Sequence, residues 1–178
     1  LGDVYKRQVL GLGKLPVYQD EQFRYLTEKL NGYITGAYIY NKMGLTEQVA
    51  TTITIATPNP VRRFRFKNLD IECVKAYCMV YPDESLVPYL RLLDAIKDMK
   101  RIPGTTGQDI YNRVKSQYFN GYSLPELEKI VSLAKSYPPR VRKVVADILG
   151  DIRQTVLQTE MAKTILPTTR FNLDYKTA

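Results

Sequence analysis

Apolar residues in the first fifty positions recur at helical spacing. In residues 21–30 they lie three and four positions apart, which predicts a short amphipathic helix. The positions that form its apolar side are Phe23, Leu26 and Leu30. Residues 36–42 predict a second short helix, which turns Ile39 inward and ends at Gly44, because glycine is favoured where a helix stops.

The next segment alternates β-branched and polar residues, a pattern typical of strands. Residues 51–57 (T-T-I-T-I-A-T) form the first such run, and P-N-P at residues 58–60 predicts a turn before a second run in residues 61–67. A third run, residues 71–80, follows after a short turn. We therefore expect about three antiparallel strands arranged as a meander.

The second half of the chain has helical periodicity. One apolar stripe after residue 84 predicts a helix, with Arg91 off the stripe. Further helices are expected around Ile110 and after Ser123, where S-L-P-E has the spacing of a capping box. A long helix is expected from about residue 140 to 165, because apolar residues repeat every four positions at Val144, Ile148, Ile152 and Val156.

Together these elements predict an α+β fold, with a small antiparallel sheet of about three strands and short helices followed by a helical C-terminal half. We divide the chain into an α/β part with the meander (residues 9–80), a helical part packed on it (residues 84–165) and an irregular tail (residues 166–178). Residues 1–8, L-G-D-V-Y-K-R-Q, resemble the translation of an adapter used in transposase-based sequencing libraries. We expect them to be an artefact, with the natural start of the protein missing.

The composition excludes several kinds of chemistry. The chain has no histidine, which excludes Ser-His-Asp and Cys-His nucleophiles and most zinc sites; we expect no catalysis and no cofactor. Cys73 and Cys78 lie five residues apart in a run that reads as extended, and we expect unpaired core thiols in a reducing compartment. The sequence has neither the roughly 18 apolar residues of a membrane helix nor a signal-peptide pattern, so we expect a cytoplasmic protein without a membrane partner.

Positive charge is the main electrostatic feature. The chain has 26 Lys+Arg and 18 Asp+Glu, a net charge of +8, which permits nucleic-acid binding without requiring it. In V-R-R-F-R-F-K, strand alternation places Arg63, Arg65 and Lys67 on one face and Phe64 and Phe66 on the other. These cations either follow nucleic-acid phosphates or form a solvated face that protects a sheet edge from pairing.

A second basic cluster lies at the start of the predicted long helix. Arg140, Arg142 and Lys143 occupy its first turn, where the helix dipole disfavours cations. They therefore need a compensating partner, either a nucleic acid, an acidic protein surface or carboxylates of the same chain. The carboxylates within reach are Glu126, Asp147 and Asp151.

Two pairs of aspartates are spaced four residues apart, so that each pair shares a helix face: Asp94 with Asp98, and Asp147 with Asp151. Such a pair can bind Mg²⁺, which leaves open an enzyme that acts on nucleotides. Lysines and arginines lie at helical spacing from both pairs, however. We expect ion pairs there and no metal.

Four segments carry a resemblance to a known family. They are residues 32–49 (G-Y-I-T-G-A-Y-I-Y-N-K-M-G-L-T-E-Q-V), 53–57 (I-T-I-A-T), 92–103 (L-L-D-A-I-K-D-M-K-R-I-P) and 137–143 (Y-P-P-R-V-R-K). In this order they resemble the AbiEi-like antitoxins of type IV toxin-antitoxin systems, which act in abortive infection. The resemblance implies an N-terminal winged helix-turn-helix that binds operator DNA and a C-terminal region that counteracts the toxin.

This sequence resembles the second of those parts, and the winged helix would precede residue 9. The resemblance implies a non-catalytic antitoxin and transcriptional autoregulator whose functional partner is a nucleotidyltransferase toxin, with or without direct contact. The polar residues of the first segment that would form a functional surface are Tyr40, Asn41, Thr46 and Gln48. Their alternative role is to satisfy the backbone of a turn. The alternative function is a stand-alone basic module that binds nucleic acid.

Overall fold

The computed structural model describes residues 17–60, 62–78 and 83–177. Residues 1–16, which include the expected adapter, lie outside the described residues. The chain divides into two compact units, Leu1–Arg91 (unit 1) and Leu92–Ala178 (unit 2). The boundary falls inside helix α4 (Val87–Asp98), so this helix contributes residues to both units.

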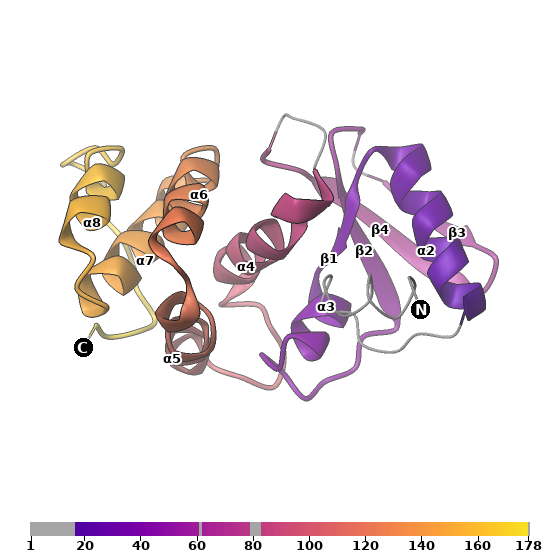
Figure 1. Ribbon diagram of the computed structural model, residues 1–178. Helices are drawn as coiled ribbons and strands as arrows, with labels where there is room; N and C mark the ends of the chain where they lie inside the picture. The colour runs from indigo at the N-terminus through magenta and orange to yellow at the C-terminus, as the bar shows by residue number, and fades with distance from the viewer. Residues whose placement is uncertain (1–16, 61, 79–82, 178) are drawn as a thin grey trace. The chain divides into compact units, whose positions relative to one another are not determined.

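Unit 1 contains a four-stranded mixed sheet (Figure 1). Its strands are β1 (Tyr33–Thr35), β2 (Thr52–Thr57), β3 (Arg63–Phe66) and β4 (Leu69–Lys75). In space they follow the order β1-β2-β4-β3, so β1 and β3 form the edges. Strands β2 and β4 run parallel, whereas β1 with β2 and β3 with β4 are antiparallel.

The predicted meander is wrong in one connection, and a strand is added. After β2 the chain crosses to the sheet edge, and β4 then lies between β3 and β2. The register accounts for this order: Ile53 pairs with Ile71 and Ile55 with Cys73, so the most apolar strands lie side by side. Cationic β3 takes the edge, where water solvates its charges. Periodicity does not predict β1, because its three residues are all buried and show no alternation.

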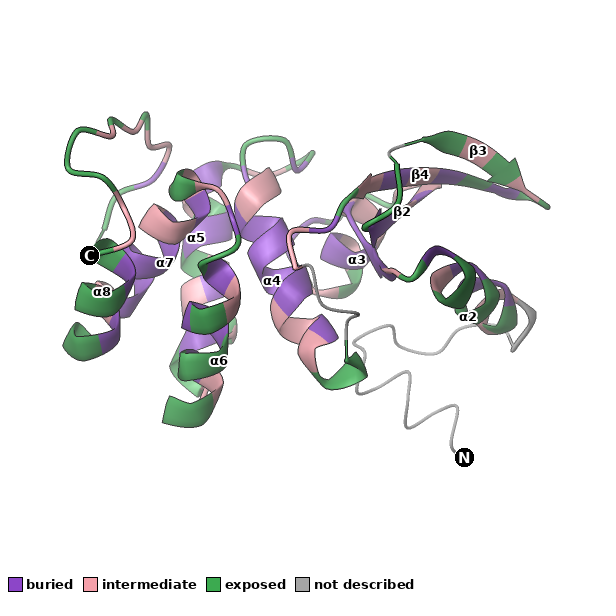
Figure 2. Ribbon diagram, turned by 90° about the horizontal axis from the view of Figure 1, so that it is seen from above, coloured by how far each residue is buried: buried purple, intermediate pink, exposed green. Residues whose placement is uncertain are grey.

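One face of this sheet is covered by two helices, α2 (Val17–Leu30) and α3 (Ala37–Lys42). Both were predicted, although α2 begins four residues earlier than expected. The apolar side of α2 is buried as predicted, since Phe23, Leu26 and Leu30 are each 3% exposed. Buried residues run along β2 and β4, whereas β3 alternates between exposed and half-buried positions (Figure 2).

Helix α4 follows a 3₁₀ turn, η1 (Glu84–Leu86). The predicted apolar stripe is present, because Leu90, Leu93 and Ile96 are fully buried. Arg91 was expected off this stripe but is only 4% exposed. Its Nε donates to the Ile34 carbonyl oxygen at 2.8 Å, so a hydrogen bond to β1 compensates for burying the guanidinium group.

Unit 2 is helical. After the end of α4 it contains α5 (Gly107–Gln117), the 3₁₀ turn η2 (Phe119–Gly121), α6 (Leu124–Ala134), α7 (Pro139–Asp151) and α8 (Thr155–Ala162). The predicted capping box is confirmed: the Ser123 hydroxyl accepts from the Glu126 N–H, and the Glu126 carboxylate accepts from the Ser123 N–H. These bonds satisfy N–H groups that have no partner inside the helix.

The prediction of one long helix over residues 140–165 is wrong, because this segment forms two helices, α7 and α8. Helix α7 ends at Asp151, and Arg153 adopts a left-handed conformation with φ of 62°. The N–H groups of Arg153 and Gln154 donate to the carbonyls of Gly150 and Leu149, which is a Schellman motif with arginine where glycine is usual. Ile148 is fully buried, whereas Val156 is 79% exposed, so the four-residue repeat does not continue as one face.

The observed fold is α+β with a helical C-terminal half, as predicted. Cys73 and Cys78 are free; Cys73 is buried in the core of unit 1, whereas Cys78 is half-buried. Within the part of the chain that the structure describes, no helix is both long and apolar enough to cross a membrane.

Candidate functional site

The basic edge strand β3 is the first candidate. Its register places Arg63 beside Glu72 and Arg65 beside Asp70 of β4. Nε and Nη2 of Arg63 donate to Glu72 Oε1 at 3.0 and 2.5 Å, and Nη1 of Arg65 lies 4.0 Å from Asp70 Oδ1. The arginine side chains are nevertheless 81% and 69% exposed. Exposed ion pairs of this kind contribute about 0–1 kcal/mol, so they hold the arginines weakly.

Lys67 does not continue this row as a strand residue. Strand β3 ends at Phe66, and Lys67 begins the turn to β4 with φ of 53°. Its Nζ lies 5.7 Å from the centre of the Phe66 ring. The predicted alternation therefore applies to Arg63 and Arg65 opposite Phe64 and Phe66, which pack against the core.

The exposed face beside these arginines is hollowed. A depression of about 430 Å³ is lined by Thr52, Arg63, Phe64, Asp70, Ile71 and Glu72. It holds one guanidinium group and two carboxylates. An anion entering it would meet Glu72 and Asp70 and must compete with Glu72 for Arg63.

The second basic cluster, at the start of α7, is held inside unit 2. Arg140 donates to the Asn172 carbonyl at 2.8 Å and to Asp174 Oδ1 at 2.5 Å. Lys143 donates to Asp147 Oδ1 at 2.8 Å. Arg142 donates to two backbone carbonyls, those of Tyr137 and Thr164.

Each of these three cations thus has a partner in the same chain, which is the intramolecular alternative left open by the sequence. Asp147 is one of the partners that the sequence predicts. The sequence does not predict Asp174, because it lies 34 residues from Arg140 and no local pattern connects them. A phosphate at this cluster would have to displace the existing contacts.

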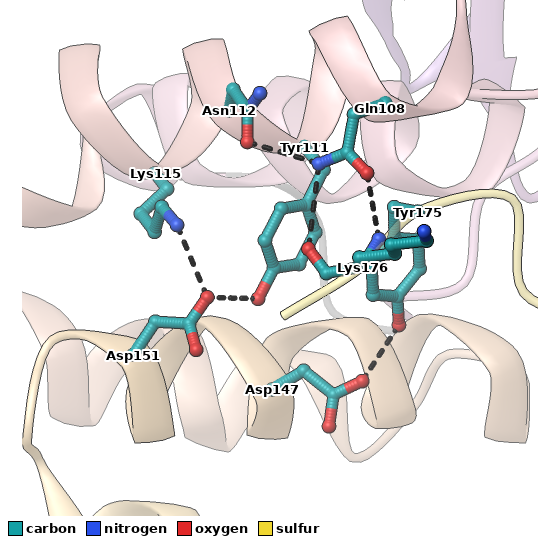
Figure 3. Close-up of polar contacts among 8 residues, drawn as sticks. All are labelled: Gln108, Tyr111, Asn112, Lys115, Asp147, Asp151, Tyr175 and Lys176. Atoms are coloured by element: carbon teal, nitrogen blue, oxygen red, sulfur yellow. Dashed lines mark hydrogen bonds and ion pairs between the residues drawn. The ribbon is translucent and has the colours of Figure 1, made fainter. Parts of the chain in front are cut away.

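The aspartates spaced four residues apart make hydrogen bonds and ion pairs. Asp151 accepts from the Tyr111 hydroxyl at 2.7 Å and from Lys115 Nζ at 3.1 Å, and Asp147 accepts from the Tyr175 hydroxyl at 2.9 Å (Figure 3). Among the residues that the structure describes, no group of three or more Cys, Asp or Glu side chains could hold a metal ion.

The two aspartates of α4, Asp94 and Asp98, lie in different environments. Asp94 is 2% exposed and accepts from the Tyr137 hydroxyl at 2.7 Å. Asp98 is half-buried and lies 3.7 Å from an Arg101 nitrogen. The Asp94 carboxylate thus accepts a hydrogen bond in the interior, whereas the Asp98 carboxylate forms an ion pair near the surface.

Two buried tyrosines of unit 2 have altered acidity. Burial raises the pKa of Tyr111, and the hydrogen bond to the Asp151 carboxylate raises it further. Burial also raises the pKa of Tyr175, with a further contribution from the negative charge of Asp147. Both hydroxyls therefore stay protonated and act as hydrogen-bond donors. Sequence reasoning did not single out these tyrosines, since their partners lie 40 and 28 residues away.

The four polar residues expected as a family-motif surface do not form one exposed patch. Tyr40 and Thr46 are 2% and 4% exposed, whereas Gln48 is exposed. Asn41 Nδ2 donates to the Thr46 carbonyl at 3.1 Å, and the Gln48 N–H donates to the Thr46 hydroxyl at 3.2 Å. These contacts fix the turn after α3, which is the alternative role considered for them.

Comparison of the chain with protein-family models gave no match. The curated proteins gave none either, and no solved structure matches.

Proposed function

We propose that this chain is the C-terminal antitoxin region of an antitoxin and transcriptional autoregulator of the AbiEi-like, type IV class, acting in abortive infection in the bacterial cytoplasm. In this proposal it counteracts a nucleotidyltransferase toxin without catalysis of its own. Operator DNA is assigned to a winged helix-turn-helix outside this sequence. The observation that carries the proposal is the set of four resembling segments in one order.

The positions of these segments in the fold support the proposal. Residues 32–49 build β1, α3 and the turn that follows, and residues 53–57 build β2. Residues 92–103 include the second half of α4, and residues 137–143 begin α7. Every segment supplies fully buried side chains, among them Ile39, Ile55, Ile96 and Val141. A resemblance located in core-forming segments of both units concerns the fold and not only a local surface motif.

The test is rescue of bacterial growth. The complete gene, including the upstream winged helix, is co-expressed with the neighbouring nucleotidyltransferase gene under an inducible promoter. We expect growth to be restored, and to be lost again with Ile96→Asp, which places a charge in the core. A complete antitoxin that is folded and abundant but gives no rescue would contradict the proposal.

A basic module that binds nucleic acid is the second candidate, favoured by the 81% and 69% exposure of the Arg63 and Arg65 side chains. If these two and Lys67 each neutralise a phosphate, the slope of log K against log salt is about −3, from about 0.9 per contact. Fluorescence anisotropy of the chain on duplex DNA across a salt series measures this slope.

A matched pair of variants separates a local site from net charge. Changing Arg63, Arg65 and Lys67 to glutamine removes three charges from the edge strand. The control variant changes three other exposed cations to glutamine: Lys129, Lys163 and Arg170. Loss of binding in the first variant alone supports the second candidate. Equal losses in both variants, or no binding at low salt, would eliminate it.

A further inference from the structure

Residues 172–176 contact several side chains of unit 2. Residues 163–177 form no helix or strand, and most of them are exposed or half-buried. Tyr175 is the exception at 6% exposed. Around it, the contacts of residues 172–176 are made with side chains of α5, α7 and the segment after α4.

An arginine holds the acidic residue of this segment. Arg140 of α7 donates to Asp174 Oδ1 at 2.5 Å and to the Asn172 carbonyl at 2.8 Å, and Lys100 donates to the same carbonyl at 2.8 Å. The Asp174 carboxylate also lies over Gly107, the first residue of α5, where any Cβ atom would collide with it. A helix N-terminus favours a negative charge, so glycine there lets the carboxylate come close.

The tyrosine enters a slot that is specific for its ring and its hydroxyl. The rings of Tyr175 and Tyr111 stack with centroids 4.3 Å apart and planes 9° apart. The Tyr175 hydroxyl donates to Asp147 Oδ2 at 2.9 Å (Figure 3). Phenylalanine would fill this slot but leave the carboxylate without that donor.

A single glutamine reads the backbone of the next residue. Gln108 Oε1 accepts from the Lys176 N–H at 2.7 Å, and Gln108 Nε2 donates to the Lys176 carbonyl at 3.4 Å (Figure 3). Nε2 also donates to Asn112 Oδ1 at 3.1 Å, which orients the amide. Because both contacts are with backbone groups, they hold this residue in position independently of the Lys176 side chain.

We propose that these side chains of α5 and α7 form a recognition site for a peptide that contains Asp-Tyr, and that residues 172–176 occupy it as an intramolecular ligand. The determinants are Arg140 with Gly107 for the aspartate, Tyr111 with Asp147 for the tyrosine, and Gln108 for the backbone. This inference goes beyond the proposed function and does not depend on it.

The connection to the rest of the chain is that of a tethered ligand. Residues 163–171 join α8 to the bound segment without helix or strand, so release breaks side-chain contacts and unwinds no element. Because residues 163–171 join this segment to α8, its effective concentration at the site is about the millimolar range or higher. A free peptide of the same sequence therefore competes poorly with the tail in the wild-type chain and binds once the tail is disabled.

The first experiment measures binding of a labelled peptide of residues 168–178 by fluorescence anisotropy. The acceptor is the full chain with Asp174→Ala and Tyr175→Ala in its own tail. We expect saturable binding at least tenfold tighter than to the wild-type chain. Adding Arg140→Gln to the acceptor abolishes it, whereas Lys129→Gln, an exposed cation of α6, leaves it unchanged.

A control peptide with alanine at both positions does not bind. Equal affinity for wild-type and tail-disabled chains would overturn the proposal, and so would absence of binding to a tail-disabled chain that circular dichroism shows to be folded.

The second experiment covers the case in which the tail-disabled chain does not fold. A protease site is inserted after Thr168, in the exposed part of the tether, and the otherwise wild-type chain is cut after purification. We expect the cut tail to co-elute with the folded body in gel filtration and to exchange for labelled peptide. Unfolding of the body on cleavage, or a cut tail that never exchanges, would make the segment an integral part of the core and overturn the proposal.

Discussion

Replacing Gly36 with alanine is expected to destabilise unit 1 for two separate reasons. Gly36 lies between β1 and α3 with φ of 79° and ψ of −167°, a backbone region essentially restricted to glycine. A Cβ atom there would also lie 2.5 Å from Oγ1 and 2.6 Å from Cβ of Thr54. The Gly36 carbonyl accepts from the N–H groups of Ile39 and Tyr40, both at 2.9 Å, so the residue cannot move without disturbing the start of α3.

The two costs are of similar size. A non-glycine residue held in such a backbone region costs about 1–3 kcal/mol. Forcing an extra methyl group into a packed site costs about 1–3 kcal/mol more. Thr54 lies in β2, and rotating its side chain moves Oγ1 but leaves Cβ in place. The expected loss is therefore at least about 2 kcal/mol of a total that is about 5–15 kcal/mol for typical proteins.

Gly121→Ala is the matched control. A Cβ atom at Gly121 would have nothing within 4 Å, and Gly121 is not among the glycines with positive φ. We expect its stability to stay within about 0.5 kcal/mol of the wild type. Because the two glycines lie in different units, urea unfolding is combined with hydrogen exchange of peptides that cover residues 33–57 and 107–134. A loss below about 1 kcal/mol for Gly36→Ala, or exchange raised equally in both regions, would refute the reasoning.

Alkaline pH is expected to destabilise the protein from about pH 10 upward, because the raised pKa values of Tyr111 and Tyr175 let the unfolded chain lose protons that the folded chain retains. Urea midpoints measured from about pH 8 to 11 should fall less steeply when both tyrosines are changed to phenylalanine. Arg153→Gly removes the left-handed strain and should raise the free energy of unfolding by up to about 1 kcal/mol, and a decrease would contradict this. Ile148→Ala should lower the free energy of unfolding by about 2–5 kcal/mol, and Val156→Ala by less than about 0.5 kcal/mol. Equal losses would indicate that both residues lie on the buried face of one continuous helix, which would contradict the break at Arg153.

The helices were largely predictable because their signals are local. The spacing of Phe23, Leu26 and Leu30 identifies the buried side of α2, and Ser123 identifies the start of α6 through its capping box. The prediction of one long helix was wrong at Arg153, because an arginine does not indicate a left-handed backbone conformation in the sequence. A glycine at that position would have indicated the stop.

The sheet was less predictable because pairing is not local. Alternation identified β2, β3 and β4 as strands but carries no information on which strand lies beside which. The parallel pairing of Ile53 with Ile71 joins residues that are separated by the whole of β3. The pairing of such distant strands depends on which apolar faces are buried together. That depends on all the elements of the fold at once, so no local segment of the sequence predicts it.

The same limit applies to the charged residues, and it changes how the positive charge of the chain is interpreted. From the sequence, the clusters at Arg63 and Arg140 are both candidates for binding phosphate. In the structure they differ, because half-buried Arg140 is held by Asp174 near the end of the sequence, whereas Arg63 pairs with Glu72 on β4 and stays 81% exposed. Arg140 thus contributes to a site that residues 172–176 of the same chain occupy. The Arg140→Gln variant tests whether binding at that site depends on this arginine. Of these two clusters, the one on β3 has arginines that another molecule can reach without displacing residues 172–174 from Arg140.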